Sequence, residues 1–197
     1  MSRQPAVKKD KDSLLFGGLF PDEFVAAFSN RACGNMSLNY ADTKDSLVNR
    51  RNFLENLGID EETLVCAKQI HGAEVKRVLS LHKGSGALTH ETALPDVDAL
   101  ITGEKNLPLA IFTADCLSIF LFDPQTRSIG LVHAGWRGTH GRIAQKTIEA
   151  MKKEFHTRPE NVCVQFGPAI RSCCYQVSKD FQSKFSSDID QRGESFF

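Results

Sequence analysis

The chain of 197 residues lacks an excess of charge of either sign, because its 24 lysines and arginines are balanced by 24 aspartates and glutamates. A protein that binds nucleic acid through a broad basic face needs such an excess, so no nucleic-acid partner is expected. No apolar run approaches the ~20 residues that a membrane-spanning helix requires, and no membrane partner is expected either. The six cysteines form neither a dense disulfide framework nor a paired Cys-x-x-Cys zinc motif.

The N-terminus has little of what a signal peptide requires. Acidic residues interrupt the lysines before the first apolar stretch, and Pro21 follows where a small-residue cleavage site would stand. We therefore expect a cytoplasmic protein with reduced thiols. Residues 1–25 are expected to form an extension with a first strand region. Residues 26–197 are expected to form a single catalytic domain, because no linker or repeat divides them.

Hydrophobic patterning predicts most elements of the central part of the chain. Short apolar runs bounded by turn signals predict strands over 64–78 (with a break at His71-Gly72), 109–112, 117–122 and 128–133. Apolar residues at helical spacing predict helices over 45–57 and 144–155. The glycines between residues 133 and 142 predict a turn that leads from the last strand into the second helix.

Asp123-Pro124 is a type I turn signal that joins two of these strands into a hairpin. If the hairpin is symmetric about the bond between Pro124 and Gln125, Cys116 lies directly opposite His133. Directly opposed residues of an antiparallel pair point to the same face. The thiol and the imidazole are then expected to converge at the open end of the hairpin, whereas a one-residue bulge would separate them.

A cysteine beside a histidine supports two kinds of site. The imidazole can raise the thiolate fraction and make the cysteine a nucleophile, or both residues can bind zinc. His71 is best placed to supply a third ligand, because it lies at the break between two strands. On spacing alone the ordinary alternative is favoured, with Cys116 as a buried small hydrophobe and His133 as a hydrogen-bonded strand end.

Three further features invite either a functional or an ordinary interpretation. The glycine turn after His133 can direct backbone amides and the Arg137 guanidinium toward a phosphate, or Arg137 can form a surface ion pair. Asp98 precedes an apolar strand, where a carboxylate can bind substrate, act as an acid or base, or cap a turn. The adjacent Cys173 and Cys174 are interpreted as packing residues.

Several motifs occur together in the order of a known family. They are Gln69-Ile70-His71-Gly72, Asp98-Ala99-Leu100-Ile101-Thr102, Thr113-Ala114-Asp115-Cys116, His133-Ala134-Gly135-Trp136-Arg137-Gly138, and Gly167-Pro168-Ala169-Ile170 followed by Cys173-Cys174-Tyr175. On these motifs the chain resembles the YfiH family, the laccase-domain-containing purine nucleoside phosphorylases. The resemblance implies an α+β fold of mixed β-sheets layered with flanking helices, as in cysteine-hydrolase-like toxins. It also implies that His71, Cys116 and His133 are both metal ligands and catalytic residues.

The resemblance further implies a zinc-dependent phosphorylase of adenosine, inosine and methylthioadenosine that also deaminates adenosine. Its partners are then small molecules, a purine nucleoside and phosphate. The candidate substrate-binding residues are Arg137, Gln69, Asp98 and Asp115, and either aspartate is a candidate acid for the departing base.

Two other activities linked to this family stay open. One is a metal-free Cys–His hydrolase acting on peptidoglycan precursors, and the other is a copper-dependent polyphenol oxidase. The chain has six histidines and no His-x-His pair, which argues against a multicopper centre. Copper can nevertheless occupy a three-ligand site.

Two features depart from the family pattern. Arg171 stands where the family usually has a small residue. Family members also usually continue for a further helix and strand beyond the position of Phe197, so the domain is expected to lack a C-terminal segment.

Overall fold

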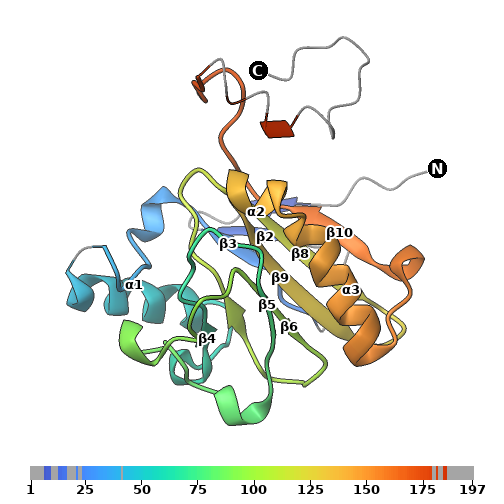
Figure 1. Ribbon diagram of the computed structural model, residues 1–197. Helices are drawn as coiled ribbons and strands as arrows, with labels where there is room; N and C mark the ends of the chain where they lie inside the picture. Colours follow the sequence, from blue (N-terminus) through green and yellow to red (C-terminus); the bar gives the residue numbers. More distant parts are fainter. Residues whose placement is uncertain are drawn as a thin grey trace.

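A five-stranded mixed sheet forms the centre of the protein (Figure 1). The computed structural model describes residues 7–9, 13–16, 21, 24–40, 42–178, 181 and 184–185. The strands of this sheet, in spatial order, are β10 (Cys163–Phe166), β8 (Leu117–Asp123), β9 (Ser128–Ala134), β6 (Ala99–Thr102) and β5 (Val75–Arg77). The pairing of β5 with β6 is parallel, and the other pairings are antiparallel.

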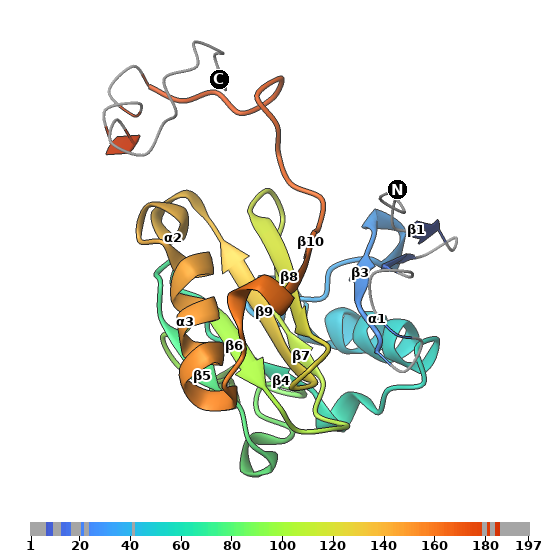
Figure 2. The ribbon, with the colours of Figure 1, turned by 90° about the vertical axis from the view of Figure 1, so that its right-hand side faces the viewer.

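The helix α3 (Ile143–Phe155) covers one face of this sheet (Figure 2). Its buried residues Ile143 and Met151 pack with Leu121 and Val132 of the central strands. Apolar residues recur on one side of the helix because a spacing of three or four residues returns to the same face. The predicted helix over 144–155 is therefore confirmed.

A second layer lies against the other face of the sheet, opposite α3 (Figure 2). It contains α1 (Thr43–Glu55) and the parallel strand pair β4 (Val65–Cys66) and β7 (Leu109–Ala110). It also contains a three-stranded sheet of β1 (Val7–Lys9), β2 (Ser13–Phe16) and β3 (Ala27–Ser29). The expected α+β class with mixed sheets and flanking helices is confirmed. Among the described residues, no helix combines the length and the apolarity needed to cross a bilayer.

The start and end of α1 follow from its sequence. The side chain of Asp42 accepts a hydrogen bond from the backbone N–H of Lys44 at 2.8 Å, which caps the first turn. Gly58 adopts a left-handed conformation (φ 68°) shortly after the last turn, as glycine commonly does at helix ends. The remaining connections contain short 3₁₀ turns at Arg31–Cys33, Glu61–Thr63, Ser80–His82, His90–Thr92 and Pro159–Asn161.

The hairpin of β8 and β9 has a longer loop than its turn signal predicts. Asp123 pairs with Ser128, so four residues form the loop, and its last residue, Arg127, has a left-handed φ of 56°. Ser118, and not Cys116, lies directly opposite His133, so the predicted pairing is wrong. Residues two apart on a strand share a face. Cys116 lies in the bend just before β8, two residues before Ser118, and its Sγ still lies within 4.8 Å of the His133 ring nitrogen.

Candidate metal centre

His71, Cys116 and His133 converge on one point where β8 begins and β9 ends, at one end of the inner strands of the central sheet. Each offers one ligand atom, and these atoms all lie within 4.8 Å of one another. The two imidazole rings meet edge to face, with centroids 4.7 Å apart. His133 is buried, Cys116 is half-buried and His71 is exposed, so the cluster is accessible on one side. Three nitrogen and sulfur ligands with an open position are typical of catalytic zinc sites.

The loop that carries His71 is held by the carboxylate of Asp98. Backbone N–H groups of Ile70, His71 and Gly72 donate to Asp98 at 3.3, 3.0 and 2.7 Å. His71 itself has a left-handed φ of 60°, a conformation that is unfavourable for most residues with a side chain. The hydrogen bonds to Asp98 therefore hold the loop in a conformation that turns the His71 side chain toward the cluster.

Asp98 also orients His133 from behind the cluster. Its Oδ1 lies 2.7 Å from Nδ1 of His133, and neither side chain has appreciable contact with solvent. The carboxylate thereby accepts a hydrogen bond from the Nδ1–H group and leaves Nε2 available as a ligand atom. Burial raises the pKa of Asp98, but hydrogen bonds from His133 and from backbone N–H groups of Gly72 and Ile70 outweigh it, and the net pKa is lowered.

These contacts change the role expected for Asp98. It was expected to bind substrate or to protonate a departing base, but its carboxylate is fully buried and its contacts are with the cluster loop and His133. A carboxyl group with a lowered pKa is also a poor proton donor near neutral pH. Asp98 is therefore a positioning residue for two of the three candidate ligands.

The electrostatics of the cluster disfavour a free thiolate at Cys116. Burial raises the pKa of the Cys116 thiol, and the carboxylates of Asp115 and Asp98 raise it further. Burial lowers the pKa of His71, as do the charges of His133 and Arg137, against an opposing effect of Asp98. A neutral imidazole is the form that binds a metal, and a bound cation draws the proton from a coordinating thiol.

Gln69 was expected to contact substrate, and the structure gives its side chain another partner. Its Nε2 donates to the carbonyl of Phe112 at 2.8 Å, and its Oε1 accepts from the N–H of Phe112 at 2.7 Å. Both ends of the amide are thus used by the segment that follows β7. Gln69 joins this segment to the His71 loop.

Arg137 and Asp115 lie on the rim of the cluster with exposed side chains. The Arg137 guanidinium stacks over the Trp136 ring, 4.8 Å from its centroid. Both belong to segments that touch the cluster, because Asp115 precedes Cys116 and Arg137 lies in the short helix α2 (Trp136–His140) that follows β9. They are the expected substrate-binding residues that remain available to a ligand.

Two glycines allow α2 to approach the cluster closely. A Cβ on Gly135 would lie 3.2 Å from both Cys116 Sγ and His71 Cδ2. A Cβ on Gly138 would lie 2.7 Å from the carbonyl oxygen of Gly72, which is closer than real side chains approach. The glycines of this turn thus serve the packing of α2 against both ligand-bearing loops.

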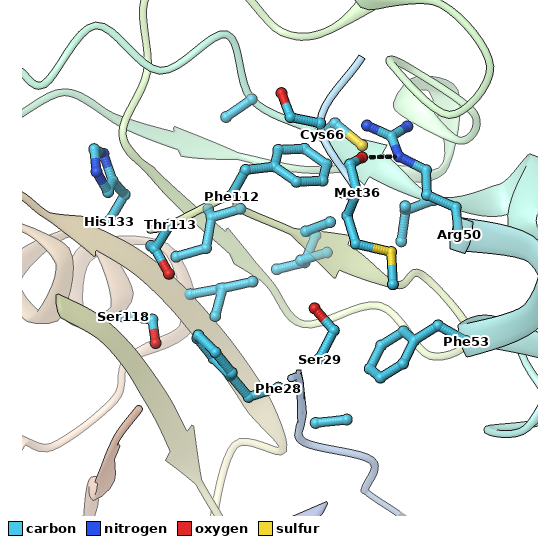
Figure 3. A pocket seen from close by; sticks show the side chains of 18 of the residues that line it. Phe28, Ser29, Met36, Arg50, Phe53, Cys66, Phe112, Thr113, Ser118 and His133 are labelled. Atoms are coloured by element: carbon cyan, nitrogen blue, oxygen red, sulfur yellow. Dashed lines mark hydrogen bonds between the residues drawn. The ribbon is translucent and has the colours of Figure 1, made fainter. Parts of the chain in front are cut away.

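A cavity of about 1260 Å³ extends from the cluster between the central sheet and the second layer, and all three ligand residues contribute to its wall. Figure 3 shows His133 at one side of this cavity and Arg50 at the other, where Arg50 Nε donates to the carbonyl of Met36 at 2.6 Å. The Ser118 hydroxyl also faces the cavity; it is buried and has no hydrogen-bond partner among the described residues. Sequence reasoning missed Ser118 and Arg50, because neither belongs to a recognisable spacing pattern.

The family described as multi-copper polyphenol oxidoreductase laccase matches residues 26–196. The chain belongs to this family. It is 41% identical over 144 residues to purine nucleoside phosphorylase YlmD of Geobacillus stearothermophilus, covering 73% of this chain and 53% of the relative. It is 34% identical over 129 residues to adenosine deaminase RL5 of an unknown prokaryotic organism, covering 66% of this chain and 49% of the relative.

Solved structures of the laccase family share the fold. The crystal structure of YlmD from Geobacillus stearothermophilus matches with a TM-score of 0.88 and 32% identity, covering 97% of this chain and 75% of that one. The Bacillus licheniformis protein YfiH matches with a TM-score of 0.84 and 27% identity, covering 93% of this chain and 72% of that one. The resemblance to YfiH proteins is thereby confirmed. The chain spans about half the length of the curated relatives it matches.

Proposed function

We propose that the chain carries the catalytic site of a zinc-dependent purine nucleoside phosphorylase that acts on adenosine, inosine and methylthioadenosine and also deaminates adenosine. The observation that carries this proposal is the convergence of two imidazoles and a thiol beside an open position. The names of relatives in the laccase family support it, since they include purine nucleoside phosphorylases and an adenosine deaminase. A cytoplasmic location is part of the same proposal.

The chemistry of the donor set fits zinc, and copper accepts the same ligands. His71, Cys116 and His133 would hold the ion, and Asp98 would keep both imidazoles in place. Zinc in such a site supplies a Lewis acid and lowers the pKa of water to about 7, which is what hydrolytic deamination requires. The exposed side of His71 is where a nucleoside would enter.

Phosphorolysis places different demands on the chain. Phosphate must attack the anomeric carbon while the bond to the base nitrogen breaks, and the departing base must take a proton. Arg137 is the candidate for phosphate, because its exposed guanidinium has the fork geometry that matches phosphate oxygens. Asp115 is the candidate proton carrier, because its exposed carboxyl group lies next to Cys116.

The test uses purified protein of known zinc content, incubated with adenosine in the presence and absence of phosphate, with the products separated by chromatography. We expect adenine with phosphate alone and inosine in both conditions. Arg137→Ala should raise the KM for phosphate and leave deamination intact, whereas the exposed control Arg158→Ala should change neither. A folded, zinc-loaded sample that forms no product, or full activity in Cys116→Ser, would contradict the proposal.

A second candidate is a metal-free hydrolase in which Cys116 is the nucleophile. The hydrogen bond from His133 to Asp98 favours it, because nucleophilic cysteines often use a histidine oriented by a third group. The raised pKa of Cys116 opposes it, since the thiol then stays protonated. Alkylation of Cys116 that is rapid and unaffected by chelators would support the hydrolase, while alkylation that chelators accelerate would support the metal site.

A further inference from the structure

Cys173 and Cys174 form a pair of exposed thiols in a turn after β10. Both side chains are exposed, and their Sγ atoms lie 3.3 Å apart. The interpretation of this pair as packing residues is therefore wrong. Figure 2 shows that the chain leaves the sheet after β10 and continues away from the body of the protein.

The backbone of the turn is fixed by hydrogen bonds. The N–H groups of Cys174 and Tyr175 both donate to the carbonyl of Arg171 at 2.9 Å. Just before the turn, the N–H of Ile170 donates to the carbonyl of Asp115 at 3.0 Å. The two thiols are thus presented side by side on a structured turn that is anchored to the rim of the metal centre.

The spacing of the two residues disfavours a disulfide between them. Adjacent Cα atoms across a trans peptide are ~3.8 Å apart, whereas disulfides usually join Cα atoms ~4.4–6.8 Å apart. Binding of a common ion does not have this restriction. Two sulfurs that each lie ~2.3 Å from one ion can be separated by up to ~4.6 Å, and the observed 3.3 Å lies within that limit.

We propose that Cys173 and Cys174 form a bidentate site for a soft, thiophilic ion, separate from the His71, Cys116 and His133 cluster. Two thiols are a softer donor set than two imidazoles and one thiol, so the pair selects Cu(I) over hard cations. This proposal does not depend on the nucleoside activity. It assigns a binding role to two thiols that take no part in the proposed catalytic site.

Phenylarsine oxide is the probe for the pair, because a trivalent arsenical binds two neighbouring thiols far more tightly than one. Two S–H bonds and the As–O bonding of the probe are lost, two As–S bonds form, and one water molecule is released. No electrons are transferred. The stoichiometry of the adduct is read from the intact mass of the folded protein.

We expect one arsenical adduct per chain in the wild type and none in Cys173→Ser or Cys174→Ser. Both residues are exposed, so neither substitution should shift the thermal midpoint. Cys33→Ser is the matched control and should keep the adduct. Cys116→Ser should also keep it, which separates the pair from the metal cluster.

A titration with Cu(I), buffered by a chromophoric chelator, provides the second arm. We expect the wild type to bind one more Cu(I) per chain than the variant in which both Cys173 and Cys174 are serine. An adduct that survives in Cys173→Ser, a wild type without an adduct, or equal copper uptake by the wild type and the double variant would overturn the proposal.

Discussion

Replacement of Asp98 by asparagine perturbs the positions of His71 and His133 without removing any of the three candidate ligands. The asparagine side chain has the same size, but one oxygen becomes an NH2 group that cannot accept a hydrogen bond. If that group takes the Oδ2 position, it faces the N–H groups of Ile70 and Gly72. If it takes the Oδ1 position, it faces the N–H of His71 and Nδ1 of His133.

Either orientation weakens the site, for different reasons. In the first, two hydrogen bonds to a charged acceptor are lost, each worth about 1.5–3 kcal/mol. The two losses sum to about 3–6 kcal/mol, and the long contact to Ile70, at 3.3 Å, places the total near the lower end of this summed range. In the second, His133 must accept at Nδ1, which puts its proton on Nε2 and removes the ligand lone pair. We therefore expect Asp98→Asn to lower the free energy of unfolding by about 3 kcal/mol or the metal affinity about 10–100-fold.

The assay is a zinc competition against a chromophoric chelator, paired with denaturant unfolding of the metal-free protein. Asp96→Asn is the matched control, because Asp96 is exposed and asparagine tolerates its left-handed φ of 57°. We expect this control to match the wild type in both measurements. An Asp98→Asn protein with wild-type unfolding and a zinc affinity within twofold of the wild type would refute the role assigned to Asp98.

Three further perturbations test the hairpin, the close packing and the metal. Burial raises the pKa of Asp123, but hydrogen bonds from Gln125, Thr126 and Thr157 outweigh this effect and lower the net pKa. Asp123→Ala should therefore lower the free energy of unfolding by about 3 kcal/mol at pH 7. In urea titrations this deficit should shrink as the pH falls below about 4. Gly138→Ala should lower the free energy of unfolding by about 1–3 kcal/mol, because the new Cβ would clash with the carbonyl oxygen of Gly72. The control Gly103→Ala, whose new Cβ has its nearest contact at 3.4 Å, should have the denaturant midpoint of the wild type. Zinc at about 1,000 times its Kd should stabilise the protein by about 4 kcal/mol, seen as a thermal midpoint that chelator lowers in the wild type and leaves unchanged in Cys116→Ser.

The predicted hairpin shows which part of a site a sequence determines. The prediction centred the hairpin one residue too early in the chain and so misjudged the partner of His133. The loop is longer by two residues, which shifts the register by one full repeat of the strand and leaves Cys116 on the expected face. The face that a strand residue occupies depends only on whether its position is odd or even, whereas its cross-strand partner depends on the length of the loop. The loop length in turn depends on hydrogen bonds to the Asp123 side chain, which the sequence pattern does not specify.

The role of Asp98 could not be predicted in the same way. A carboxylate before an apolar strand is compatible with a turn cap, a substrate ligand or a catalytic acid. The decision depends on the fold around it, because β6 places Asp98 beside β9 and beneath the His71 loop at the same time. Arg50 illustrates the same limit, since its burial in α1 follows from carbonyl groups of Met36, Gly86 and Ala87 that are distant in the sequence.

The left-handed backbone conformation at His71 lowers the stability of the fold at a residue of the candidate metal centre. A residue with a side chain loses roughly 1–2 kcal/mol in this conformation, and glycine or asparagine loses less. The chain therefore has the most exposed of its three candidate ligands at a position where folding alone would favour a different residue. A screen of variants of this position for thermal stability should therefore enrich glycine and asparagine, and such variants would lack one of the three candidate metal ligands.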